Sequence, residues 1–160
     1  MIHRDSGPIV VGVDVGGPKN GFHAVALLDG QFVEMHSSLI AAEIAEWCRT
    51  LKVSVVGIDA PFRWSLTGGA GPCERAFAAQ GLHPFATPSQ TVGEQHPFHR
   101  WMLNGADLYR SLRPDYFLFN GQWQLSSPVC FETFPPCCGL CAGKKYSLCQ
   151  AETQRSFEGA

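Results

Sequence analysis

Two short apolar runs, at residues 9–15 and 53–60, lack the strict alternation of apolar and polar residues that a half-exposed strand shows. Such runs are typical of strands buried on both faces, which occur in parallel sheets. Each run carries an aspartate near its end, Asp14 or Asp59, with a glycine or a proline two residues later. We therefore expect two neighbouring parallel strands whose carboxyl ends each present a carboxylate, where ligands of α/β sheets bind.

The residues after the first run predict an antiparallel meander. Residues 22–28 and 31–36 resemble strands, and a two-residue Asp-Gly turn joins them. This turn is a strong hairpin signal. The first run is therefore expected to be one strand of a three-stranded meander.

A helix is expected to follow the meander over residues 39–51, where apolar residues recur near helical spacing. Ser37 and Ser38 precede it and are expected to cap its first turn. Because crossover connections are nearly always right-handed, this helix should return the chain to a strand parallel to the first.

The second half of the chain is less regular. A Gly-rich stretch leads into a short helix near residues 74–80, and the Pro-containing segment 82–98 is expected to be a loop or lid, since long loops in compact domains tend to be functional or mobile. A helix over 98–112 and two strands, at 116–119 and 129–135, are predicted after it.

Composition indicates a single globular domain over residues 1–160, with 45% hydrophobic and 11% aromatic residues. The net charge of −2 argues against a broad basic surface, so any contact with nucleic acid should be local or metal-mediated. The N-terminus lacks the apolar core of a signal peptide, and no segment reaches the roughly 18 apolar residues that span a bilayer. We expect a cytoplasmic protein without a membrane anchor.

The chain has seven cysteines, an odd number that does not fit a secreted disulfide scaffold. We expect them to be reduced. Cys138 and Cys141 form a C-x-x-C motif, but no second pair at zinc-finger spacing follows. Core packing is therefore favoured over zinc binding.

Four motifs carry a resemblance to a known family: Gly-Val-Asp at 12–14, Gly-Ile-Asp-Ala-Pro-Phe at 57–62, Pro-Cys-Glu-Arg at 72–75, and Glu-Thr-Phe-Pro at 132–135 with a later Ala-Gly-Lys. From about residue 9 to 145 the chain resembles domain of unknown function family 429, regarded as predicted ribonuclease H-like nucleases. The resemblance implies an α/β ribonuclease H-like fold, a mixed sheet made of a three-stranded antiparallel meander plus parallel strands, flanked by helices.

The resemblance also implies a Mg²⁺ or Mn²⁺ site in which Asp14 and Asp59 bind the metal and Glu132 completes the cluster. Ribonuclease H-like nucleases generally place a last carboxylate on a C-terminal helix. After Glu132 the only acidic residues are Glu152 and Glu158, and neither lies in the Asp-Ala-rich context of the family. We therefore expect that the C-terminal helix of the fold is missing, or that the last ligand comes from elsewhere.

Each candidate residue also has a simpler interpretation. Asp14 and Asp59 are common turn formers taken singly, but their matching places at two strand ends favour a shared metal. Glu132 could instead be a solvated residue at a strand edge. Lys19 and Arg75 are candidates for contacting a substrate phosphate, Arg75 because it lies near a helix N-terminus and can form a bidentate fork. For both, an ordinary exposed cation is the simpler and favoured interpretation.

Three functions remain open from the sequence. The first is a Mg²⁺- or Mn²⁺-dependent nuclease that hydrolyses phosphodiester bonds. The second is a non-catalytic ribonuclease H-like module that has lost full metal ligation. The third is an actin-like ATPase or phosphotransferase, which would need two such lobes where 160 residues provide room for one.

Overall fold

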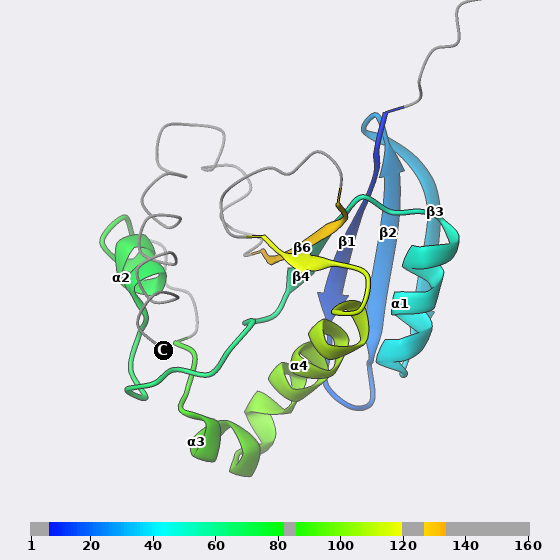
Figure 1. Ribbon diagram of the computed structural model, residues 1–160. Helices are drawn as coiled ribbons and strands as arrows, with labels where there is room; N and C mark the ends of the chain where they lie inside the picture. The colour runs from blue at the N-terminus through cyan, green and yellow to red at the C-terminus, as the bar shows by residue number, and fades with distance from the viewer. Residues whose placement is uncertain (1–6, 82–85, 120–126, 134–160) are drawn as a thin grey trace, which may run out of the picture.

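The computed structural model describes residues 7–81, 86–119 and 127–133. A six-stranded sheet with strand order β3-β2-β1-β4-β6-β5 forms its centre (Figure 1). The strands are β1 (Ile9–Val15), β2 (Phe22–Leu28), β3 (Gln31–Ser38), β4 (Val55–Asp59), β5 (Phe117–Leu118) and β6 (Val129–Glu132). The helices are α1 (Ala41–Thr50), α2 (Pro72–Ala78), α3 (Gln90–Gln95), the 3₁₀ helix η1 (Pro97–His99) and α4 (Arg100–Leu112).

The pairing of the strands confirms the mixed sheet that the sequence predicted. β1, β2 and β3 form the antiparallel meander. β4 pairs in parallel with both β1 and β6, and β5 pairs in parallel with β6. This is an α/β fold consistent with the ribonuclease H-like type, in which α1 is the crossover between the meander and β4.

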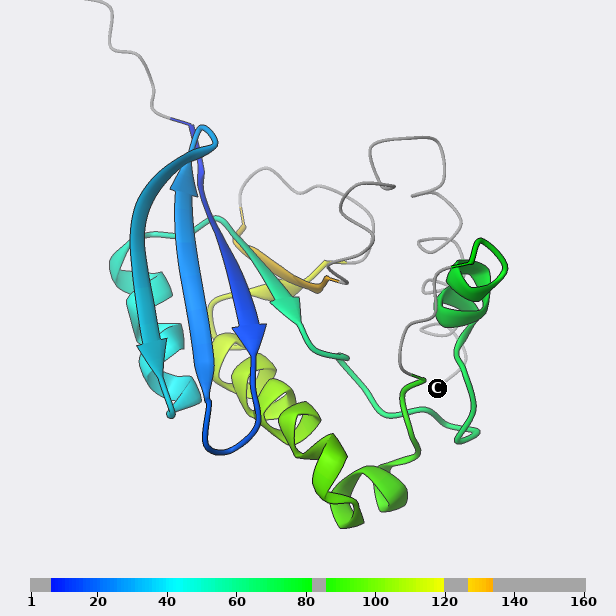
Figure 2. The ribbon, with the colours of Figure 1, turned by 180° about the vertical axis from the view of Figure 1, so that it is seen from behind.

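Helices α1 and α4 pack side by side on one face of the sheet, and this face holds the core. The α4 residues Leu108 and Leu112 are fully buried, as is Ile44 of α1. From β1, β2 and β4 the following residues point into this core: Val11, Val13, Val15, Phe22, Ala24, Ala26, Val56 and Ile58. Figure 2 shows the sheet from behind, with α1 and α4 on its far side.

The expectation that β1 is buried on both faces was wrong. Its residues alternate, with Val11, Val13 and Val15 buried and Gly12 and Asp14 exposed. The run looked continuous in the sequence because glycine neither breaks an apolar run nor marks an exposed face. One side of β1 therefore remains open around Asp14.

The predicted cap of the first helix was also placed differently. Ser37 and Ser38 are the last residues of β3, and the N-cap position of α1 is Ile40. Ser38 still supports the helix start, because its hydroxyl accepts the Ile40 N–H at 2.9 Å and donates to the Glu43 carboxylate. The β-strand thus continues two residues further than its apolar pattern indicated.

The segment between β4 and α4 contains more helix than the sequence suggested. Helix α3 falls inside the stretch expected to be a loop, and η1 begins there and ends at His99, one residue beyond it. Pro88 and Pro97 lie outside α3, one near each end. The Glu74 carboxylate of α2 accepts the N–H of Gly71 and both the N–H and the hydroxyl of Thr87, the last two at 2.7 Å. Glu74 therefore joins α2 to the chain that leads into α3.

None of the helices in the described parts of the chain is long and apolar enough to cross a membrane.

Cys48 and Cys130 are free and buried. The C-x-x-C pair, Cys138 and Cys141, lies outside the described residues.

Candidate metal centre

Asp14 and Asp59 are paired residues of two adjacent parallel strands. β1 and β4 run in register from Val10 opposite Val55 to Asp14 opposite Asp59. Laterally paired residues of parallel strands point to the same face, and the strands lie about 4.8 Å apart. Both carboxylates therefore stand together at the carboxyl end of the sheet, on the face that α1 and α4 leave open.

The electrostatics of the pair reflect this closeness. The pKa of Asp59 is raised above its ordinary value, first by partial burial and second by the negative charge of Asp14. Two carboxylates that repel each other in the absence of a cation are a suitable ligand pair for a hard divalent ion. Mg²⁺ commonly binds through one or two carboxylates and keeps several waters or substrate oxygens. The two residues thus fit Mg²⁺ or Mn²⁺.

Glu132 does not join the two aspartates. Its lateral partner on β4 is Ile58 rather than Asp59, so it does not belong to the row of paired residues that contains Asp14 and Asp59. Its carboxylate accepts the backbone N–H of Phe62 at 3.1 Å. Among the residues that the structure describes, no group of three or more His, Cys, Asp or Glu side chains is arranged to hold a metal ion.

The environment of Glu132 favours its protonated form. The residue keeps an exposed edge, yet protein surrounds its carboxyl group enough that desolvation raises its pKa to about 7. The Phe62 N–H and the charge of Arg63 oppose this increase, whereas Glu74 and Asp59 add to it. Near neutral pH this carboxyl group can therefore exchange a proton readily.

Helix α4 holds the two chain segments that follow the aspartates. The Asn104 amide donates a hydrogen bond to the carbonyl oxygen of Gly16 at 2.8 Å, two residues after Asp14. The Tyr109 hydroxyl donates to the carbonyl oxygen of Ala60 at 3.2 Å, one residue after Asp59. One rigid helix thus fixes both strand ends relative to each other.

A close approach between α4 and the end of β4 makes this arrangement possible. A β-carbon placed on Gly105 would lie 2.4 Å from the β-carbon of Ala60, so only glycine fits there. Phe62 also packs edge-on against the Tyr109 ring, with 5.7 Å between the ring centroids. Asn104, Gly105 and Tyr109 could not be identified from the sequence, because they form no recognisable motif within a helix.

The two expected phosphate contacts occupy different places. Lys19 is exposed in the turn that follows β1, at the same end of the strand as Asp14. Arg75 lies on α2, which Figures 1 and 2 show well apart from β1, and its guanidinium donates to the carbonyl oxygen of Ala70. The structure therefore brings Lys19, but not Arg75, to the end of the sheet that carries the aspartates.

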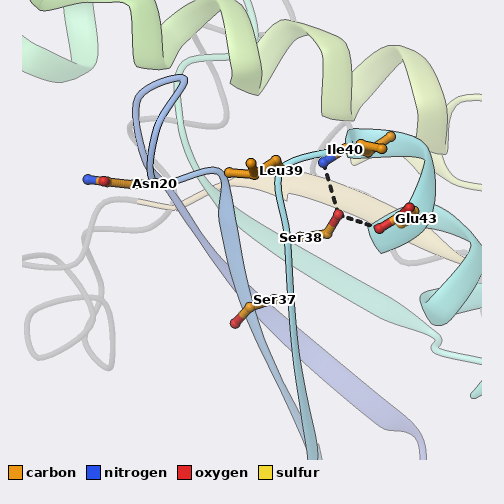
Figure 3. A pocket seen from close by; sticks show the side chains of 6 residues that line it. All are labelled: Asn20, Ser37, Ser38, Leu39, Ile40 and Glu43. Atoms are coloured by element: carbon orange, nitrogen blue, oxygen red, sulfur yellow. Dashed lines mark hydrogen bonds between the residues drawn. The ribbon is translucent and has the colours of Figure 1, made fainter.

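A shallow, open hollow of about 440 Å³ lies beside the start of β2 and the end of β3 (Figure 3). Its lining consists of Asn20, Ser37, Ser38, Leu39, Ile40 and Glu43. Glu43, in the first turn of α1, binds the Ser38 hydroxyl there.

Comparison with known proteins gives a match to a family model. No curated protein and no solved structure matches the chain. A family model described as "Protein of unknown function (DUF429)" matches residues 12–154, a range that includes Asp14, Asp59 and Glu132. This range covers most of the 160 residues, and the chain therefore belongs to the DUF429 family.

Proposed function

We propose that this protein is a Mg²⁺- or Mn²⁺-dependent nuclease that hydrolyses phosphodiester bonds of nucleic acid in the cytoplasm. The observation that carries the proposal is the in-register pairing of Asp14 with Asp59 on an open sheet face. A bound divalent ion would lower the pKa of a water molecule and neutralise charge on the scissile phosphate.

The protein's own residues have distinct roles in this proposal. Asp14 and Asp59 hold the ion, and Asn104 and Tyr109 keep the two strand ends in place. Glu132 is a proposed third ligand or water-orienting group, and one of its two carboxylate oxygens accepts the Phe62 N–H. Lys19 is the proposed contact for a substrate phosphate, and for Arg75 this role would require a move of α2 toward the sheet.

The test is cleavage of single-stranded, duplex and hybrid oligonucleotides with Mn²⁺, beside an ATP hydrolysis assay. Metal activation of water is worth several kcal/mol, so Asp14→Asn and Asp59→Asn should each lower the rate by about a hundredfold or more. Asp107→Asn is the matched control, because Asp107 is an exposed α4 residue whose carboxylate forms an (i, i+3) ion pair with Arg110 at the surface. Cleavage that survives both Asp14→Asn and Asp59→Asn would reject the nuclease site at these two residues.

A second candidate is a non-catalytic module that binds a metal or nucleic acid without cleaving it. The specific observation in its favour is that the described residues assemble two carboxylates rather than three. Metal-dependent binding of an oligonucleotide with no cleavage under any condition would support this candidate over the nuclease.

A further inference from the structure

The row of residues that contains Asp14 continues across the meander. Asp14 of β1 pairs with His23 of β2, and His23 pairs with Ser37 of β3. Directly paired residues of antiparallel strands share a face, with β-carbons about 4.5–5.5 Å apart. Asp59, Asp14, His23 and Ser37 therefore form one line across four strands.

This line lies on the open face of the sheet. Asp14, His23 and Ser37 are all exposed, whereas their neighbours along the strands, such as Val13 and Ala24, are buried under the helices. Figure 2 shows the open face of β1, β2 and β3 toward the viewer. Ser37 also lines the hollow beside the strand ends, with Asn20 (Figure 3). A ligand held at the aspartates can thus extend along the line toward the hollow.

His23 is held in a defined orientation. Its Nδ1 atom and the Ser37 hydroxyl form a hydrogen bond of 2.9 Å. When the hydroxyl donates to Nδ1, the other ring nitrogen, Nε2, carries the proton and is a hydrogen-bond donor. A donor oriented in this way suits a phosphate oxygen, which is a strong hydrogen-bond acceptor. Contacts of this kind fix the register of a nucleic acid on a protein.

We propose that His23 and Ser37 form a subsite for a phosphodiester group of a nucleic acid strand, next to the one held at Asp14 and Asp59. The inference rests on the proposed function and names the part of the substrate that this line of residues recognises. His23 lies one strand spacing from Asp14 and Ser37 lies two, which together span about 10 Å. Such a span accommodates a neighbouring phosphate of the same strand.

The first test compares the KM of an eight-nucleotide single strand with that of bis(p-nitrophenyl) phosphate, which has no second phosphodiester. His23→Ala should raise the KM of the oligonucleotide about tenfold, the effect of one hydrogen bond to a charged group, with little change in kcat. The effect on the small diester should be clearly smaller. His23→Gln keeps a donor in the side chain and should recover most of the loss.

The matched control is His36→Ala. His36 lies on β3 but faces the helices, where its ring stacks on Trp47 with 5.7 Å between centroids. This variant should leave both KM values unchanged. If His23 and Ser37 only stabilise the sheet, His23→Ala would lower the melting temperature and leave the KM of the oligonucleotide unchanged, and that result would overturn the subsite.

The second test separates the subsite from the proposed function. Binding of a fluorescein-labelled eight-nucleotide strand is followed by anisotropy with Ca²⁺ as the metal. Weaker binding by His23→Ala and Ser37→Ala, with normal binding by His36→Ala, supports the subsite even if no cleavage occurs, a result that would reject only the nuclease. Equal binding by the wild type and all three variants, or no binding by the wild type, would overturn the subsite.

Discussion

The Nδ2 atom of Asn104 lies 2.8 Å from the carbonyl oxygen of Gly16 and so joins the middle of α4 to the turn that follows Asp14. Tyr109, five residues further along α4, makes the equivalent bond to Ala60 after Asp59. The geometry of the aspartate pair therefore depends on a helix that contributes no carboxylate to it.

Removing the Asn104 side chain should loosen the Asp14 end of the site. We expect Asn104→Ala to lower the free energy of unfolding by about 1 kcal/mol, the usual effect of a lost hydrogen bond. The Kd for Mn²⁺, measured by calorimetry, should rise by several-fold. Ser111→Ala is the control on the same helix, since its hydroxyl donates to the Asp107 carbonyl within α4. An unchanged Mn²⁺ Kd in Asn104→Ala would show that α4 does not position the pair.

A methyl group at Gly105 should separate α4 from the end of β4. The 2.4 Å approach to the Ala60 β-carbon is far below van der Waals contact, so Gly105→Ala should destabilise the fold by about 1–3 kcal/mol in spite of the better helix propensity of alanine. Chemical denaturation measures this effect. Gly12→Ala has open space around its β-carbon and serves as the comparison. Equal stability of the two variants would contradict the close packing.

Divalent metal should stabilise the protein through the aspartate pair. At ten times the Kd, Mn²⁺ should add about 1.4 kcal/mol to the free energy of unfolding and raise the melting temperature accordingly. Asp14→Asn should abolish this increase. It should also stabilise the metal-free protein, because the Asp14 charge, which after partial burial is the second cause of the raised pKa of Asp59, is gone. A melting curve that does not respond to millimolar Mn²⁺ in the wild type would reject the site.

Stability should fall with rising pH because of Glu132. Its pKa is about 7 in the folded protein against an ordinary value of 4.5, so the folded state binds the proton more tightly than the unfolded state. The resulting stabilisation is complete below pH 4.5 and is lost as the pH rises to about 7. Glu132→Gln should lack this loss.

The size of the Glu132 effect is limited by the exposed edge of the residue. After a discount for solvent screening we expect about 1 kcal/mol, or roughly 2–4 °C in melting temperature, between pH 4.5 and 7.5. The measurement is the difference in melting temperature between Glu132→Gln and the wild type across this range, without metal. A difference independent of pH would mean that the Glu132 carboxyl group ionises as it does in water.

The sequence was sufficient to predict the parts of the fold that local patterns determine. The runs that became β1 and β4, and the Asp-Gly turn between β2 and β3, carry their structural signal within a few residues. The pairing of Asp14 with Asp59 followed from strand direction, because both aspartates close strands that a single crossover makes parallel.

The remaining features depend on contacts between distant residues. The bonds from Asn104 and Tyr109 cross 88 and 49 residues of sequence, and a single chain gives no local sign of either. The line formed by His23 and Ser37 depends on strand register, and β3 continues through Ser37 and Ser38, which resemble a helix cap in sequence. Glu132 resembles the aspartates in the sequence because it also ends a strand, but its partner in the sheet is Ile58 rather than Asp59.

The central claim, that Asp14 and Asp59 bind one divalent ion together, is tested most directly by a crystal structure of the protein with Mn²⁺ and its anomalous difference map. We predict one strong peak between the two side chains, with an oxygen of each carboxylate about 2.1 Å from the ion. The Asp59→Asn variant should lose this peak under the same conditions. A map without a peak at the ends of β1 and β4, at saturating Mn²⁺, would contradict the account.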